Sequence, residues 1–142
     1  MCYPDNCLRG ISNQSQVQED DLVANDVFYF LDDHTRADGT FEQSINWDDE
    51  NAIPFTLSQK RQDGSLQFRG GVAVIARCDL DRLSKLPAFG EALSYDRQPL
   101  PENPYHGNLI LTAGISKARR KAIAVTLAMH VSRIIFQAYQ KL

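Results

Sequence analysis

A proline-rich loop in the last third of the chain holds the residues best suited to chemistry. It spans residues 99–108 and contains His106, which is followed by Gly107. Prolines restrict the backbone and so lower the entropic cost of holding a side chain in one geometry. An imidazole held in this way can act as a general base or as a hydrogen-bond donor. We expect His106 to be catalytic and Asn108 to orient it and contact a ligand; alternatively, both tie the loop to the sheet.

Basic residues gather at the start of a predicted helix just after this loop. Ser116 is a good N-cap, and Lys117, Arg119, Arg120 and Lys121 follow it. A helix N-terminus carries partial positive charge and free N–H groups, so it attracts anions and disfavours cations. We therefore expect Ser116, Lys117, Arg119 and Arg120 to bind a phosphate or carboxylate. The alternative is a basic surface turn that pairs with acidic loops.

Arg9 is a second candidate catalytic residue. It lies in the apolar segment 7–11, next to Gly10. An arginine on a strand beside a glycine can reach into a cleft and hold a phosphate through two N–H groups at once. The alternative is an arginine at the surface or in a salt bridge, as most arginines are.

The string of residues 8–11 resembles the arginine-bearing first strand of ADP-ribosyltransferase-type enzymes. Those enzymes use that arginine or a histidine, a later serine or tyrosine, and often a glutamate, to hold NAD and polarise its glycosidic bond. The resemblance implies these roles for Arg9, Ser44 and Glu91. It covers a handful of residues, and their spacing does not identify the family.

Polar residues surround the only tryptophan of the chain. Ser44 and Trp47 are expected to bind a ligand, because an indole can stack on a base or another ring. The alternative for Trp47 is a core or hinge position, since tryptophan is usually well buried. Residues 48–50 are three acids, and carboxylates suit magnesium. Consecutive side chains point in different directions, however, so no metal site is predicted.

Strands and helices must alternate along the chain to position these residues. Strands are predicted at residues 7–11, 27–31, 72–76 and 108–113. A short helix is predicted over residues 80–86 with Asp79 as its cap, and a long amphipathic helix runs from Ser116 to about Tyr139. The sequence therefore predicts a single α+β domain over residues 1–142. Its mainly antiparallel curved sheet would pack against the long C-terminal helix and the short helix near residues 79–86.

A hairpin is predicted in the middle of the chain. Residues 53–59 alternate between apolar and polar side chains, as a half-buried strand does. Asp63 and Gly64 then form a favourable turn, and residues 66–69 alternate again.

The overall composition restricts which partners and which cellular location are expected. The chain has 142 residues, three cysteines without metal-like spacing, and a net charge of -3. This acidic balance makes nucleic acid an unlikely partner. The N-terminus lacks the pattern of a signal peptide, and no apolar run is long enough to span a membrane, so a cytoplasmic location is expected.

These features favour a small domain that binds a phosphorylated or nucleotide-like ligand. The expected pocket combines Arg9, His106 and the basic turn at residues 116–120. Whether the ligand is also transformed stays open, and the sequence identifies no cofactor. The alternative is a non-catalytic interaction module or homodimer that uses the C-terminal helix, through residues 134–136 and Tyr139.

Overall fold

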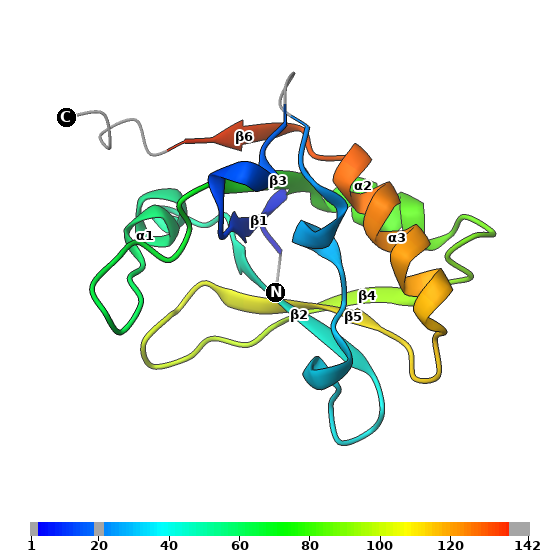
Figure 1. Cartoon of the computed structure of the whole chain (residues 1–142). Coiled ribbons are helices and arrows are strands. Elements are labelled where there is room, and N and C mark those ends of the chain that lie inside the picture. The colour runs from blue at the N-terminus through cyan, green and yellow to red at the C-terminus, as the bar shows by residue number, and fades with distance from the viewer. Residues whose placement is uncertain (1–2, 19–21, 137–142) are drawn as a thin grey trace.

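One antiparallel sheet organises the part of the chain that the computed structural model describes, residues 3–18 and 22–136 (Figure 1). Its strand order is β4-β5-β2-β1-β3-β6. The strands are β1 (Asn6–Ile11), β2 (Phe41–Trp47), β3 (Gly71–Ala76), β4 (Leu93–Arg97), β5 (His106–Leu111) and β6 (Arg133–Ile135). The helices are α1 (Ala52–Ser58), α2 (Arg77–Ser84) and α3 (Lys117–Met129), with 3-10 turns η1 (Gln14–Gln16), η3 (Asn25–Phe28) and η4 (Asp32–His34). The predicted α+β class is confirmed.

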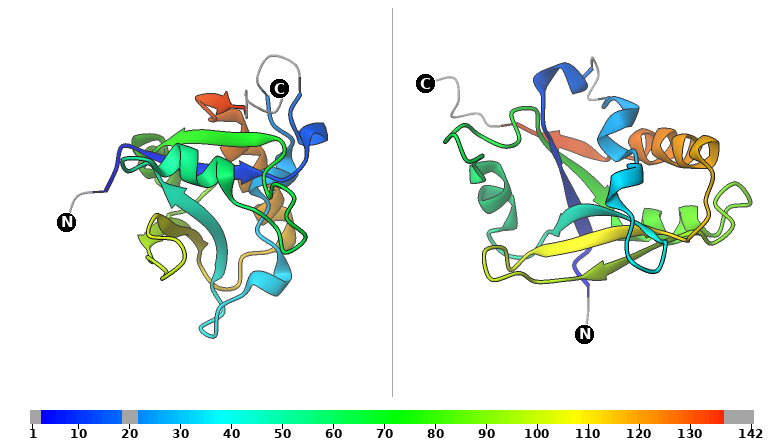
Figure 2. Two further views of the ribbon diagram at one scale, coloured as in Figure 1. Left: turned by 90° about the vertical axis from the view of Figure 1, so that its left-hand side faces the viewer. Right: turned by 60° about the horizontal axis from the view of Figure 1, so that its bottom comes forward.

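The sheet opens between β1 and β2. Strand β1 pairs with β3 along its whole length, from Asn6 to Ile11. Its register with β2 has only two pairs, Cys7 with Trp47 and Leu8 with Asn46. Beyond Leu8 the two strands diverge, and Figure 2 shows β1 running at a steep angle to β2 and β5. After Leu8, β1 therefore stays paired with β3 on one side and has no paired strand on the side of β2.

Two apolar clusters hold the sheet from opposite faces. The larger cluster packs α2, α3 and the segment around η3 on the sheet, and its bulkiest buried members include Phe28, Phe30, Trp47, Leu109, Leu111 and Ile123. The smaller cluster lies under α1 and comprises Leu8, Ala52, Leu57, Val72 and Val74. Because β1 and β3 contribute side chains to both clusters, they form the covered centre of the sheet.

The predicted strand at residues 53–59 is wrong, because this segment forms helix α1. A short apolar run fits both the strand and the helix periods. Here Ala52, Thr56 and Leu57 are the buried positions, which is helical spacing. Pro54 lies in the first turn, where a helix tolerates proline. Of the predicted hairpin only one bridge remains, between residues 60 and 66.

The predicted strand at residues 27–31 is also wrong. Val27 and Phe28 belong to η3, and residues 29–31 are not part of a strand. Val27, Phe28 and Phe30 are nevertheless buried, against α3 and the sheet. The apolar composition thus predicted the burial correctly, but the segment has no partner strand.

The C-terminal helix is shorter than expected. Helix α3 has 13 residues and ends at Met129, and the chain continues as β6 beside β3. The expected interaction residues 134–136 are therefore not helical, and Tyr139 lies outside the described residues. Helix α2 begins at Arg77, two residues before the expected cap at Asp79. No helix within the described ranges is long and apolar enough to cross a membrane.

Candidate functional site

A cleft occupies the place where β1 and β2 separate. Its volume is about 400 Å³, and both Arg9 and Ser44 line it. Further walls come from α1, from residues 59–68 and from the loop before β5. Small-molecule pockets typically measure about 300–1,000 Å³, so the cleft has the size for a small ligand.

Arg9 supplies the cation of the cleft. Its Nε donates to the carbonyl oxygen of Val27 at 2.8 Å, and its Nη1 donates to that of Ser44 at 2.7 Å. A guanidinium has five N–H groups, so three have no acceptor among the described residues. No carboxylate in the described ranges forms an ion pair with it. Burial lowers the pKa of Arg9 to about 10, which still leaves it charged at neutral pH.

Gly10 allows an aromatic wall beside this cation. A Cβ built on Gly10 would lie 2.3 Å from the ring of Phe68. Only a residue without a side chain lets the ring lie this close to β1. Phe68 and Arg9 therefore line the cleft together, which offers a ligand both an aromatic surface and a positive charge.

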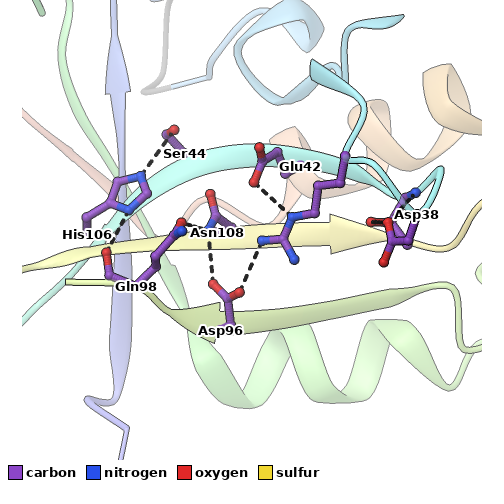
Figure 3. Close-up of polar contacts among 9 residues, drawn as sticks. Asp38, Glu42, Ser44, Asp96, Gln98, His106 and Asn108 are labelled. Atoms are coloured by element: carbon purple, nitrogen blue, oxygen red, sulfur yellow. Dashed lines mark hydrogen bonds and ion pairs between the residues drawn. The ribbon is translucent and has the colours of Figure 1, made fainter. Parts of the chain in front are cut away.

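Ser44 and His106 form a polar pair on neighbouring strands (Figure 3). In the register of β2 and β5, His106 lies opposite Asn46, which makes Ser44 its diagonal neighbour on the same face. The Nε2 atom of His106 lies 3.3 Å from the hydroxyl of Ser44, and its Nδ1 lies 3.0 Å from the carbonyl oxygen of Gln98. A carbonyl can only accept, so this hydrogen-bond network assigns the proton to Nδ1. Nε2 is then free to accept from the Ser44 hydroxyl.

Asn108 supports this pair through Gln98. Its Nδ2 donates to the Gln98 side chain at 2.9 Å and to Asp96 at 3.0 Å. The backbone N–H of Gln98 also donates to the carbonyl oxygen of His106 at 2.9 Å. Asn108 is buried and does not line the cleft. The expected orientation of His106 by Asn108 is thus indirect, with Gln98 in between.

Buried amides form the floor of the cleft. The Nδ2 of Asn46 donates to Thr56 at 2.7 Å, and its oxygen accepts from Asn103 at 2.8 Å. The oxygen of Asn103 accepts the backbone N–H of Tyr105 at 3.0 Å. These bonds link β2 to α1 and to the proline-rich loop. These bonds therefore fix the proline-rich loop, which holds the first residue of β5, His106, beside Ser44.

The structure brings together some of the sequence-predicted residues and separates others. Arg9, Ser44 and His106 share the cleft. Glu91, the third match of the family resemblance, lies in a different hollow with Tyr95 and has a positive φ of 60°. The acid that lines the cleft is Glu102, in the loop before β5.

The basic turn at the start of α3 does not reach the cleft. Ser116 caps the helix by accepting the backbone N–H of Arg119 at 3.2 Å. Arg119 donates to the carbonyl oxygens of residues 88 and 89. Arg120 is buried and pairs with Asp32 at 2.6 Å. Lys117 is exposed and lines no part of the cleft. Arg119 and Arg120 thus have structural partners that offset their unfavourable place at a helix N-terminus.

Trp47 is a core residue, so its position does not suit ligand stacking. It is fully buried, packs against Tyr3 and Tyr95, and donates through Nε1 to the carbonyl oxygen of Asp96 at 2.9 Å. A Cβ on Gly107 would lie 2.3 Å from that Nε1. The glycine beside His106 therefore makes room for Trp47 on the core face and opens no space for a ligand.

Sequence reasoning missed several residues of the cleft. These are His34, Asn46, Thr56, Gln59, Gln67, Phe68, Glu102 and Asn103. One signal was present: Asn46 lies between the apolar residues Ile45 and Trp47, and an amide buried in a strand needs polar partners. The others come from segments whose positions depend on the divergence of β1 and β2, which local sequence patterns do not encode.

The comparisons with known proteins give no family. No protein-family model matches the chain, and neither the curated proteins nor the solved structures that were searched include a match. Within the described residues, no group of three His, Cys, Asp or Glu side chains could hold a metal ion. The function must therefore be argued from the cleft itself.

Proposed function

We propose that the cleft between β1 and β2 binds a phosphorylated, nucleotide-like ligand through Arg9. The observation that carries this proposal is the environment of the guanidinium. Arg9 lines the cleft, three of its N–H groups have no acceptor among the described residues, and no carboxylate there forms an ion pair with it. Arginine holds phosphate through parallel N–H bonds, so a phosphate fits these donors.

The rest of the cleft suits the remainder of such a ligand. Phe68 offers a ring on which a base can stack, and stacking on aromatic side chains tolerates any base. Gln59 and Gln67 also line the cleft and supply amides that can bond to ribose hydroxyls or base edges. A mononucleotide or dinucleotide therefore matches the mixture of cation, ring and amides better than a bare inorganic anion does.

NAD is the first dinucleotide to test. Two of the three positions matched by the resemblance to ADP-ribosyltransferase-type enzymes, Arg9 and Ser44, lie in the same cleft. The third match, Glu91, does not. This supports a shared mode of ligand binding more than a shared reaction, and the proposal is limited to binding.

The test is a calorimetric titration of the purified protein with NAD, ADP-ribose, AMP and inorganic phosphate. The informative variants are Arg9→Gln and Lys117→Gln, because each removes one positive charge, one in the cleft and one at the start of α3. We expect binding of at least one nucleotide that Arg9→Gln weakens at least about tenfold, since a hydrogen bond to a charged group contributes about 1.5–3 kcal/mol. We expect Lys117→Gln to bind as the unchanged protein does.

A further variant, Ser12→Glu, tests the same site even if Arg9→Gln has a folding defect. Ser12 is exposed and lines the cleft, so Ser12→Glu places a negative charge there without removing a hydrogen bond of Arg9. It should weaken binding while the melting temperature stays unchanged. Weakened binding in Lys117→Gln alone would place the ligand at the helix start. Absence of binding by all four compounds would refute the proposal.

A further inference from the structure

We propose that Ser44 and His106 form a nucleophile–base pair and that the cleft can transfer acyl groups from activated esters. This goes beyond ligand binding and does not require that the ligand be a nucleotide. A side-chain nucleophile works when a base can take its proton and a third group orients the base. The hydroxyl of Ser44, the imidazole of His106 and the carbonyl of Gln98 supply these three parts.

The imidazole is set in the tautomer that a base needs. Its Nδ1–H donates to the carbonyl oxygen of Gln98 at 3.0 Å, which leaves a lone pair on Nε2 directed toward Ser44. Gln98 is itself held twice, by the Nδ2 of Asn108 at 2.9 Å and by its own N–H to the carbonyl oxygen of His106. The separation of 3.3 Å between Nε2 and Oγ is at the loose end of hydrogen bonding, as is common in sites without substrate.

The hydroxyl of Ser44 is accessible, and the guanidinium of Arg9 is bonded to the backbone of the same residue. Ser44 is exposed on the face of β2 that lines the cleft. The Nη1 of Arg9 donates to the backbone carbonyl oxygen of the same residue at 2.7 Å. A positive charge in the same cleft favours the negative charge that develops on an acyl oxygen during attack.

The proposed reaction is the hydrolysis of an ester in two steps. The Oγ of Ser44 bonds to the acyl carbon while its proton moves to Nε2 of His106. The tetrahedral adduct then expels the alcohol oxygen with its electron pair, and the alcohol takes the proton from Nε2. Water, activated by the same nitrogen, next attacks the acyl-Ser44 ester and releases a carboxylic acid and the free hydroxyl.

The test is acetylation by p-nitrophenyl acetate, with the site of acetylation read by peptide mass spectrometry. Ser94 is an internal reference, because it is an exposed serine on β4 and no histidine contacts it among the described residues. We expect Ser44 to be acetylated at least about tenfold faster than Ser94. In the variant His106→Gln this advantage should disappear, since general-base catalysis contributes about 10²–10⁴ in rate.

Two control variants test whether the fast acetylation of Ser44 depends on His106 in particular. His130→Gln removes a histidine that does not line the cleft and that bonds to the carbonyl oxygen of Thr126. This variant should keep the fast acetylation of Ser44. Ser44→Ala removes an exposed hydroxyl, so it should keep the melting temperature and lose the rapid release of p-nitrophenolate.

Three results would overturn the proposal. Equal acetylation of Ser44 and Ser94 would show an ordinary hydroxyl. Unchanged acetylation of Ser44 in His106→Gln would show that the imidazole is not its base. Undiminished release of p-nitrophenolate by Ser44→Ala would show that another group, such as the imidazole itself, is the nucleophile.

Discussion

Arg120 at the start of α3 is buried and Arg9 in the cleft is half-buried, and both donate to backbone carbonyl oxygens. Arg120 also pairs with Asp32 at 2.6 Å and lies over the ring of Phe41, 4.3 Å from its centroid. Its Nη1 donates to the carbonyl oxygen of Phe30 at 3.0 Å. Arg9 has two carbonyl acceptors and no carboxylate within the described ranges, and the residue lines a cavity.

The difference separates a cation that holds the fold from one that is available to a ligand. Arg120 joins α3 to the segment between η3 and η4, and only 5% of its surface is exposed. The ion pair, the packing and the carbonyl bond of Nη1 all come from within the chain, whereas the buried Nε has no hydrogen-bond partner among the described residues. A desolvated cation without a counter-ion, as at Arg9, costs free energy that an anionic ligand can offset.

The largest expected effect is on stability, at Arg120. Arg120→Ala should lower the free energy of unfolding by about 3 kcal/mol, because it removes a buried side chain together with its carbonyl bond. Urea denaturation followed by circular dichroism measures this change. Arg119→Ala is the control. Arg119 also bonds to two carbonyl oxygens but is exposed, so we expect a loss under about 1 kcal/mol. Equal losses would mean that burial does not distinguish the two positions.

The next effect is on binding, at Arg9. Arg9→Gln should weaken nucleotide binding at least about tenfold and lower the free energy of unfolding by about 2 kcal/mol, because two hydrogen bonds with a typical net value of about 1 kcal/mol each are lost. Titration calorimetry and urea denaturation of the same preparation give both numbers. A stability loss as large as that of Arg120→Ala, with binding intact, would mean that Arg9 is a structural arginine like Arg120 and does not bind the ligand.

A smaller effect of opposite sign is expected at Glu102. This exposed carboxylate lines the cleft and opposes an anionic ligand there. Glu102→Gln should tighten nucleotide binding by about two- to fivefold at low ionic strength, because exposed charge pairs contribute roughly 0.2–1 kcal/mol. The gain should fade in high salt. Weaker binding in this variant would instead indicate that the carboxylate accepts hydrogen bonds from the ligand.

The smallest effect is expected at Lys117. It is an exposed cation in the first turn of α3, where the helix dipole disfavours positive charge. Lys117→Glu should raise the free energy of unfolding by a few tenths of a kcal/mol and leave binding unchanged. Thermal denaturation and calorimetry check the two statements. A clear loss of stability would indicate that the lysine has a structural anionic partner.

Part of the fold was readable from local patterns. The strands that begin at Asn6 and Gly71, the cap at Ser116 and the turn at Gly114 agree with the structure, because each depends on neighbouring residues. The run at residues 53–59 was misread as a strand, since seven residues fit either period until their packing is known. The end of α3 was missed for a related reason. Its apolar pattern continues into β6, where Ile134 pairs with Ala73 instead of extending the helix.

The candidate site divides in the same way. Residue types alone identified Arg9, Ser44 and His106, because a strand arginine, a hydroxyl and an imidazole are what such chemistry needs. The sequence also suggested Arg119 and Arg120, and no local feature distinguished them from Arg9. The role of each arginine depends on the distant groups that it contacts. Arg119 bonds to residues 88 and 89, and Arg120 bonds to residues 30 and 32, whereas Arg9 lines the cleft.

The sequence by itself determined the α+β class, the buried segments and the chemical groups that could act. Composition, periodicity and capping depend on near neighbours, so they can be read along the chain. Only the tertiary structure decided that β1 and β2 part after two pairs, which opens the cleft, and that β2 pairs with β5 in the register that places His106 beside Ser44. That separation follows from packing between residues far apart in the chain, and these contacts decide which cation stabilises the fold and which one faces the cleft.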